Sequence, residues 1–261
     1  MVPEKRRIAL GTRLRRCHNV ITLGVKPNFD DYSPDEQEWI TGADRIYYPT
    51  AFYADLFNTM GKPTFPSYHN YKLIQDKIRQ TAMFTMQKLP HPRTRVFYGK
   101  RSHRQIPDYF RYPFVGKIPR GSSQGRGVYL ISSHRDLESY CRQTHAAYIQ
   151  EFLPARRNIR VVVIGRCAVH AYWREAQAGE FRTNLSVGGR IFLDPVPEEA
   201  TDLALLTAER CGFDDVGIDI HEHEGRFLVI EANMKYGREG FRRAGIDYHR
   251  LMEGLIDRGE I

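Results

Sequence analysis

Gly217-Ile218-Asp219-Ile220 and, further on, Val229-Ile230-Glu231-Ala232-Asn233 place polar side chains inside two short apolar runs typical of β-strands. Glu231 and Asn233 are two residues apart, so they share one face of their strand. A hairpin that turns at residues 224–226 would set Asp219 opposite Glu231. Acids buried among Ile and Val are costly without a cation, and Mg²⁺ prefers hard oxygen ligands. We therefore predict a metal site made of Asp219, Glu231 and Asn233.

The alternative for these acids is an exposed hairpin edge, but the apolar neighbours on both sides argue against exposure. The adjoining residues His221-Glu222-His223-Glu224 include metal-binding types. They fall at the expected hairpin tip, where alternate residues face opposite ways. We therefore predict a solvated turn there and not a second metal site.

Upstream, a glycine-rich loop connects two further predicted strands. Lys117 lies near the end of the first strand, Pro113 to Ile118, and the second strand runs from Gly127 to Ile131. Glycines let backbone N–H groups approach phosphate oxygens, and the lysine adds a positive charge. The loop does not end in Gly-Lys-Ser/Thr and leads into a strand, so it is not a Walker A motif. We predict a phosphate-binding loop, the alternative being a hairpin with a chance lysine.

A third segment carries arginines. Arg174 is followed by Phe181-Arg182-Thr183-Asn184, and Arg160 lies upstream. Arginines bind phosphate oxygens and stabilise charge that moves during group transfer. The alternative is that these arginines lie on the surface, because the chain is basic. The nearby predicted metal site and phosphate-binding loop favour a role in binding phosphate.

The composition sets broad limits on function. The 261 residues carry a net charge of +8, and the hydrophobic share of 41% is typical of a globular protein. Three basic clusters are compatible with nucleic-acid binding, but no nucleic-acid motif accompanies them, so such binding is not expected. No apolar run is long enough for a membrane span or signal peptide, which predicts a cytoplasmic protein without a membrane partner. The four cysteines form no Cys-x-x-Cys pair and are expected to be reduced.

Strands and helices alternate irregularly, with frequent hairpins, which predicts α+β sheets in two lobes. A helix is expected to begin after Ser33, and a long one to run from Asn70 to Leu89. The gap between the strands Arg7 to Gly11 and Asn19 to Leu23 is too short for a crossover helix, so a hairpin is expected there. The predicted division is an N-terminal unit (1–92), a central lobe (93–153) and a C-terminal lobe (154–261).

Taken in this order, the segments resemble an ATP-grasp enzyme of the RimK-like glutamate-ligase group. The resemblance covers Asn70 to Ile256. It rests on the metal-site residues, Lys117 with its loop, Arg174, and the following motifs: Asp76-Lys77, Pro92-Arg93-Thr94, Gln150-Glu151-Phe152-Leu153, Asn158-Ile159-Arg160, Phe181-Arg182-Thr183-Asn184 and Gly188-Gly189.

The resemblance implies an ATP-grasp fold, with ATP held between the two lobes and a short α/β unit in front of them. Asp219, Glu231 and Asn233 would bind two Mg²⁺ ions, or Mn²⁺ in their place. Arg174, Arg182 and Asn184 would stabilise the charge that moves during catalysis. Glu151 and Phe152 would contact the adenine, and Asn158 the ribose or its surroundings. The implied nucleotide site is Lys77, Lys117, Gly121, Ser122, Ser123, Gly125, Gly127, Glu151, Phe152, Asn158 and Arg160.

The implied reaction joins a carboxylate to an amine through an acyl phosphate, with release of ADP. Glutamate or another amino acid would be added to a protein or small-molecule acceptor, and members of this family often form homo-oligomers. Two alternatives are another ATP-grasp phosphotransfer activity and a non-catalytic nucleotide- or nucleic-acid-binding module. Asn158 replaces the Asp usual in the family, so a changed nucleotide contact is expected there. The first unit is compact, so the family does not define the acceptor.

Overall fold

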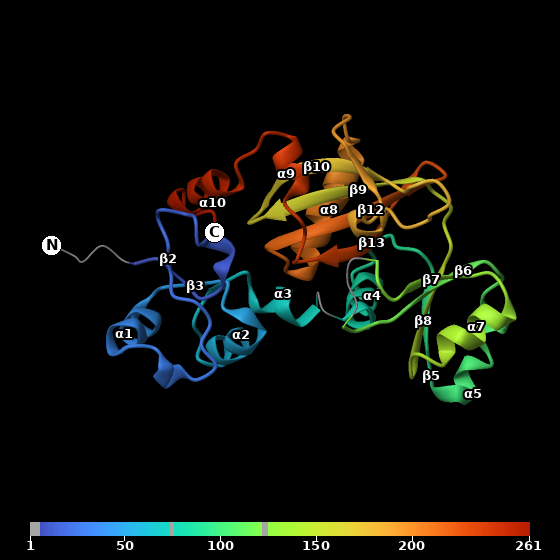
Figure 1. The fold of residues 1–261 in the computed structure, drawn as a ribbon, viewed down its shortest axis with the longest axis horizontal. Coiled ribbons are helices and arrows are strands. Elements are labelled where there is room, and N and C mark those ends of the chain that lie inside the picture. The colour runs from blue at the N-terminus through green and yellow to red at the C-terminus, as the bar shows by residue number, and fades with distance from the viewer. Residues whose placement is uncertain (1–5, 74–75, 122–124) are drawn as a thin grey trace.

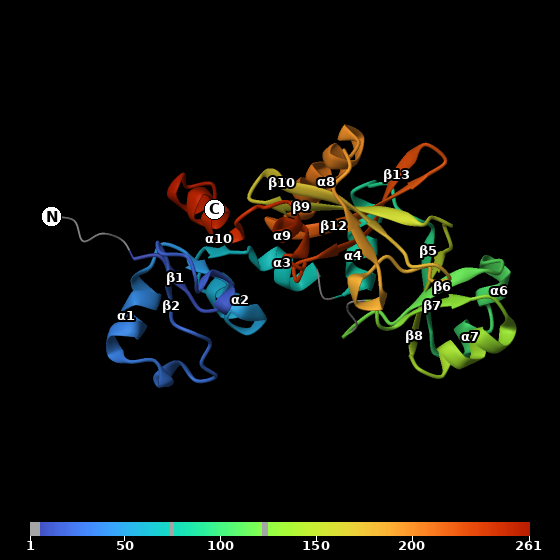
Figure 2. The same ribbon diagram turned by 45° about the horizontal axis from the view of Figure 1, so that its top comes forward.

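The computed structural model describes residues 6–73, 76–121 and 125–261. Its sheets lie along the longest dimension of the molecule (Figure 1). A sheet from the N-terminal residues lies at one end and a second sheet at the other, and the C-terminal sheet lies between them. The view in Figure 2 gives the same arrangement.

The N-terminal sheet is parallel throughout, so the hairpin expected at the start of the chain is wrong. Its strands, in order, are β2 (Ile21–Thr22), β1 (Ile8–Ala9), β3 (Ile46–Tyr47) and β4 (Thr64–Phe65). Residues 10–20 carry the chain back across the sheet with only a 3₁₀ helix, Thr12–Leu14, and the buried side chains of Leu14 and Cys17. Two-residue strands need only this short crossover.

The first α-helix of this region begins at a side-chain cap. In α1 (Pro34–Gly42), the Ser33 hydroxyl accepts from the N–H of Glu36, whose carboxylate accepts from the N–H of Ser33, as the sequence predicts. A 3₁₀ helix, Phe29–Asp31, precedes α1, and α2 (Thr50–Thr59) follows it.

The expected long helix from Asn70 to Leu89 is wrong. It is divided into α3 (Tyr68–Leu73) and α4 (Lys77–Met86). The Asp76 carboxylate accepts from the N–H groups of Ile78 and Arg79, and the N–H of Lys77 donates to the carbonyl of Pro119. A new helix therefore starts at Asp76, beside the strand that leads into the glycine-rich loop.

The central sheet is antiparallel and lies at the far end from the N-terminus (Figure 1). Phe97, Phe114 and Ile149 form part of its core. Its strands, in order, are β5 (Thr94–Tyr98), β8 (Ala146–Glu151), β6 (Phe114–Lys117) and β7 (Val128–Ile131), and its helices are α5 (Gly99–His103), α6 (Ile106–Tyr109) and α7 (His134–Cys141).

The C-terminal sheet has β9 near its centre, with apolar cores on both faces. Val161 and Val163 face one core and Val162 and Ile164 the other. The strands, in order, are β11 (Arg190–Phe192), β10 (Cys167–Glu175), β9 (Arg157–Ile164), β12 (Asp215–His223) and β13 (Arg226–Asn233). The accompanying helices are α8 (Glu198–Cys211), α9 (Glu239–Arg243), α10 (Tyr248–Asp257) and the 3₁₀ helix Leu185–Val187.

This mixture of helices with separate, mostly antiparallel sheets agrees with the predicted α+β class. All four cysteines are free, and Cys17 and Cys211 are buried while Cys167 is exposed. Across residues 6–73, 76–121 and 125–261, no helix has both the length and the apolar character needed to cross a bilayer.

Candidate active site

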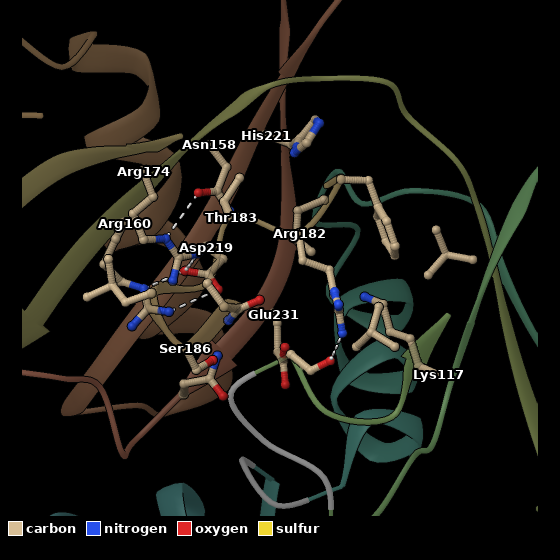
Figure 3. A pocket seen from close by; sticks show the side chains of 18 of the residues that line it. Lys117, Asn158, Arg160, Arg174, Arg182, Thr183, Ser186, Asp219, His221 and Glu231 are labelled. Carbon is tan, nitrogen blue, oxygen red and sulfur yellow. Dashed lines mark hydrogen bonds and ion pairs between the residues drawn. The ribbon is translucent and has the colours of Figure 1, made fainter. Parts of the chain in front are cut away.

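A cavity of about 440 Å³ lies between the central and C-terminal sheets. It brings together residues that are up to 162 positions apart in the chain, from Lys77 to Glu239. Figure 3 shows side chains from both sides turned toward one another. The predicted site residues that line it are Lys77, Lys117, Gly125, Glu151, Phe152, Asn158, Arg160, Arg174, Arg182, Asn184, Asp219, Glu231 and Asn233.

Two of the predicted phosphate-loop residues that the structure describes are not among those lining the cavity. Gly121 and Gly127 are described and lie outside the lining. Gly127 has a structural place instead, because its carbonyl accepts from the N–H of Ile118 at 2.7 Å and closes the base of the loop. Ser122 and Ser123 lie outside the described residues.

The Asp219 carboxylate is held by two arginines from neighbouring strands. Arg160 of β9 donates to both of its oxygens, with Nη2 at 3.0 Å from Oδ2, and Nη2 of Arg174 of β10 lies 2.8 Å from Oδ1. Burial by itself would raise the pKa of Asp219, but the two guanidinium groups hold that pKa below its usual value. All three side chains are buried. The two arginines and Asp219 thus form a buried triad with one excess positive charge.

Strand register explains why these residues meet. Asp219 is the cross-strand partner of Arg160, and Arg174 is the partner of Asn158. Nε of Arg174 donates to Oδ1 of Asn158 at 3.1 Å. Asn158 therefore orients an arginine of the triad, a contact that the sequence alone did not reveal.

Lys117 lies across the cavity from the triad, with Glu231 between them in the view of Figure 3. Nζ of Lys77 lies 3.2 Å from Oε1 of Glu231. The pKa of Lys117 is lowered to about 8, chiefly by burial; Glu231 opposes this shift and Lys77 contributes to it. An anionic ligand in the cavity would favour the charged form of Lys117, so this side chain is well placed to bind phosphate.

Arg182 connects the two sides of the cavity. Its Nη1 donates to the carbonyl of Gly125, at the end of the glycine-rich loop, at 3.0 Å. Nε and Nη2 of Arg182 donate to the carboxylate of Glu180, and these hydrogen bonds lower the pKa of Glu180 to about 2. Gly125 has a φ of +75°, and a Cβ there would lie 3.0 Å from Oδ1 of Asn184. The loop and residues 180–184 therefore contact each other across the cavity.

Several lining residues were not predicted from the sequence, and the turn predicted at His221 is wrong. The solvated turn expected at residues 221–224 begins later, because β12 continues to His223. His221 shares the Asp219 face of the strand and lines the cavity, whereas Glu222 and Glu224 are exposed. Strand alternation could have placed His221 beside Asp219. The other lining residues not predicted as site residues include Tyr172, Phe181, Thr183, Ser186, Lys235 and Glu239.

The residues proposed as metal ligands have the donor types that suit Mg²⁺. Asp219 and Glu231 are register partners across β12 and β13, as predicted, and Asn233 is two residues beyond Glu231. In the described part of the chain, no group of three or more His, Cys, Asp or Glu residues could hold a metal. Two carboxylates and an amide oxygen leave coordination positions for phosphate oxygens, which is usual for Mg²⁺. A cation at Asp219 would share that carboxylate with Arg160 and Arg174.

Two lobes that enclose a cationic cavity, with a glycine-rich loop on one lobe and acidic strand residues on the other, define the ATP-grasp class of fold. The sequence model of the RimK-like ATP-grasp domain matches residues 74–256. The chain therefore belongs to the RimK-like ATP-grasp family, which confirms the resemblance. Its similarity to named ligases confirms the expectation that it is an ATP-grasp ligase.

Three comparisons illustrate this. A probable alpha-L-glutamate ligase of Legionella pneumophila (strain Corby) is 31% identical over 232 residues, which are 84% of this chain and 72% of the relative. A ribosomal protein bS6–L-glutamate ligase of Escherichia fergusonii is 31% identical over 192 residues, covering 70% and 64% of the two chains. The crystal structure of a RimK-domain ATP-grasp protein from Sphaerobacter thermophilus matches with a TM-score of 0.69 at 19% identity, covering 96% of this chain and 98% of that one.

Proposed function

We propose that this protein is a Mg²⁺- and ATP-dependent carboxylate–amine ligase that adds glutamate or another amino acid to a carboxylate on a protein or small-molecule acceptor. The observation that carries this proposal is the meeting of Lys77, Lys117 and Glu231 with the Arg160–Asp219–Arg174 triad around one cavity. Its volume of about 440 Å³ lies within the range of small-ligand sites.

The nucleotide is proposed to lie with its adenine against Glu151 and Phe152 and its phosphates toward Lys77 and Lys117. The glycine-rich loop would cover the phosphates, with Gly125 among its cavity-lining residues. Asp219, Glu231 and Asn233 would hold Mg²⁺, which neutralises phosphate charge when bound. This orientation puts the terminal phosphate beside the triad.

In the first step, an acceptor carboxylate oxygen attacks the γ-phosphorus. The bond between this phosphorus and the β–γ bridging oxygen breaks, and ADP leaves with that electron pair. Arg174, Arg182 and Asn184 are proposed to stabilise the negative charge on the transferring group, because guanidinium and amide N–H groups already line the cavity there. The product is an acyl phosphate.

In the second step, the amine nitrogen attacks the acyl carbon and phosphate leaves. The nitrogen loses a proton to solvent or to the departing phosphate, and an amide bond remains. The Arg182–Gly125 contact across the cavity supports a role in keeping water from the acyl phosphate, which water would otherwise hydrolyse.

The substrates are proposed by analogy with relatives. A Legionella relative carries the name of a probable alpha-L-glutamate ligase, and an Escherichia relative that of a ribosomal-protein glutamate ligase. These names favour glutamate as the amino acid and a protein as the acceptor. The cytoplasmic location, the domain boundaries and a homo-oligomeric state stay predictions.

The test is the release of ADP and phosphate from Mg-ATP, with single amino acids and a cell extract as the source of acceptor. Glu231→Gln is the control, because it removes a proposed metal ligand while keeping the size and a polar oxygen. We expect ADP release that depends on one or a few amino acids and is lost in the variant. ADP release without any amino-acid dependence would point to another phosphotransfer activity, and release of AMP would overturn the proposal.

A further inference from the structure

His221 is a cavity-lining residue to which neither the sequence nor the proposed reaction assigns a role. It lies two residues beyond Asp219 on the same face of β12 and lines the cavity with it (Figure 3). The β9–β12 register runs from Asp215 to Ile220, which pairs with Ile159. One further step in this antiparallel register places His221 beside Asn158.

The side chain of His221 makes a backbone contact, but one of its polar atoms lacks a hydrogen-bond partner. Its ring interacts with the backbone of Leu153, in the segment proposed to contact the adenine. Its Nε2 is buried and has no hydrogen-bond partner. A buried polar atom without a partner costs stability, so the bound state of the cavity is the natural place for this nitrogen to find one.

The position of His221 limits what that partner can be. Glu151, Phe152 and Leu153 line the same cavity, and the strand register places Asn158 beside His221. Lys77, Lys117 and Glu231, which are proposed to surround the phosphates, are on other strands and helices. Between an adenine site and a phosphate site lies the sugar, whose hydroxyl groups can donate to or accept from an imidazole nitrogen.

We propose that His221 Nε2 hydrogen-bonds a ribose hydroxyl of the bound nucleotide and so makes this enzyme discriminate ribonucleotides from deoxynucleotides. The inference rests on the proposed function, because it takes the cavity to be the ATP site. A site built around a hydrogen bond rejects the analogue that lacks the partner group, since the buried nitrogen is then left unpaired. His221 is thus assigned as a specificity-determining residue.

The experiment measures the Kd of Mg-ATP, 2′-deoxyATP and 3′-deoxyATP by calorimetry for the wild type, His221→Leu and His221→Gln. The wild type should bind one deoxynucleotide about 2- to 12-fold more weakly than ATP, the range of a neutral hydrogen bond. His221→Leu should bind all three nucleotides alike. His221→Gln retains an amide that can hydrogen-bond, so it should keep part of the preference.

The matched control is His223→Leu. His223 lies on the same face of the strand but outside the cavity lining, with its Nε2 3.9 Å from Oε1 of Glu224. It should discriminate like the wild type. Melting temperatures of the ligand-free variants separate a folding defect from a lost contact, because a general loss of structure would weaken all three nucleotides together.

Two results would overturn the inference while leaving the proposed function in place. One is a wild type that binds ATP and both deoxynucleotides equally, and the other is a His221→Leu variant that retains the wild-type preference. A wild type that binds no adenine nucleotide at all would instead overturn the proposed function, and the inference with it.

Discussion

Replacing Asp219 by Ala should damage the fold as well as the chemistry. The sequence assigns Asp219 only the role of a metal ligand. The structure shows that its carboxylate also neutralises Arg160 and Arg174, and all three side chains are less than a tenth exposed. Removing it leaves two guanidinium groups buried side by side without a counter-charge.

The magnitude follows from this burial. Breaking a buried ion pair by removing one partner costs about 3–5 kcal/mol. With about 2–4 °C of melting temperature per kcal/mol for a chain of roughly this size, Asp219→Ala should melt about 6–20 °C below the wild type. The assay is thermal unfolding followed by circular dichroism without nucleotide or metal.

A triple variant tests the cause. Asp219→Leu combined with Arg160→Met and Arg174→Met removes all three charges and replaces them with apolar side chains of similar size. Because such replacements are often neutral or stabilising, the triple variant should regain most of the lost stability. Two results would refute a charge-balancing role for Asp219. One is a melting temperature of Asp219→Ala within about 2 °C of the wild type, and the other is a triple variant that is no more stable than Asp219→Ala.

Three other predictions concern single residues. Glu231→Gln should abolish turnover yet change the melting temperature little, because its partner Lys77 at 3.2 Å keeps an oxygen to bind; an active variant would refute its role as a metal ligand. Lys117→Met should weaken ATP binding about 10- to 150-fold in calorimetry, the range for a hydrogen bond from a charged group, and an unchanged Kd would contradict the phosphate-binding role. Burial raises the pKa of Asp214 to about 6. The protein should therefore lose stability as the pH rises from about 4 to 6, because the Asp214 carboxyl loses its proton at a lower pH in the unfolded state than in the folded state. In urea unfolding, Asp214→Asn should reduce the change in the free energy of unfolding over this pH range by at most about 3 kcal/mol. Parallel pH profiles of variant and wild type would exclude this contribution of Asp214.

Local patterns in the sequence were enough to predict much of the C-terminal sheet. Two apolar runs joined by a short polar turn predict the pairing of Asp219 with Glu231, and these residues are register partners in the structure. The start of α1 follows from the capping pattern at Ser33 and Glu36. Both depend on neighbours close in the chain, which a single sequence displays.

The misses have long-range causes. The division of the predicted Asn70 to Leu89 helix depends partly on the carbonyl of Pro119, which accepts from Lys77. The parallel pairing of Ile8 with Ile21 depends on a crossover whose buried side chains pack against the rest of the protein. The contacts of Arg160 and Arg174 with Asp219 join three strands, so their sequence spacing gives no indication of them. His221 was missed because residues 221–224 were taken as a hairpin tip, whereas β12 continues to His223.

The most direct test of the central claim is the stoichiometry of the reaction. Purified protein is incubated with Mg-ATP, glutamate and a mixture of candidate acceptors. The phosphorus-containing products are quantified by ³¹P NMR, and the mass of the acceptor is measured by mass spectrometry. We expect one ADP and one phosphate for each amide bond formed, with none of the three in Glu231→Gln. AMP with pyrophosphate, or ADP formed without a new amide bond, would contradict it.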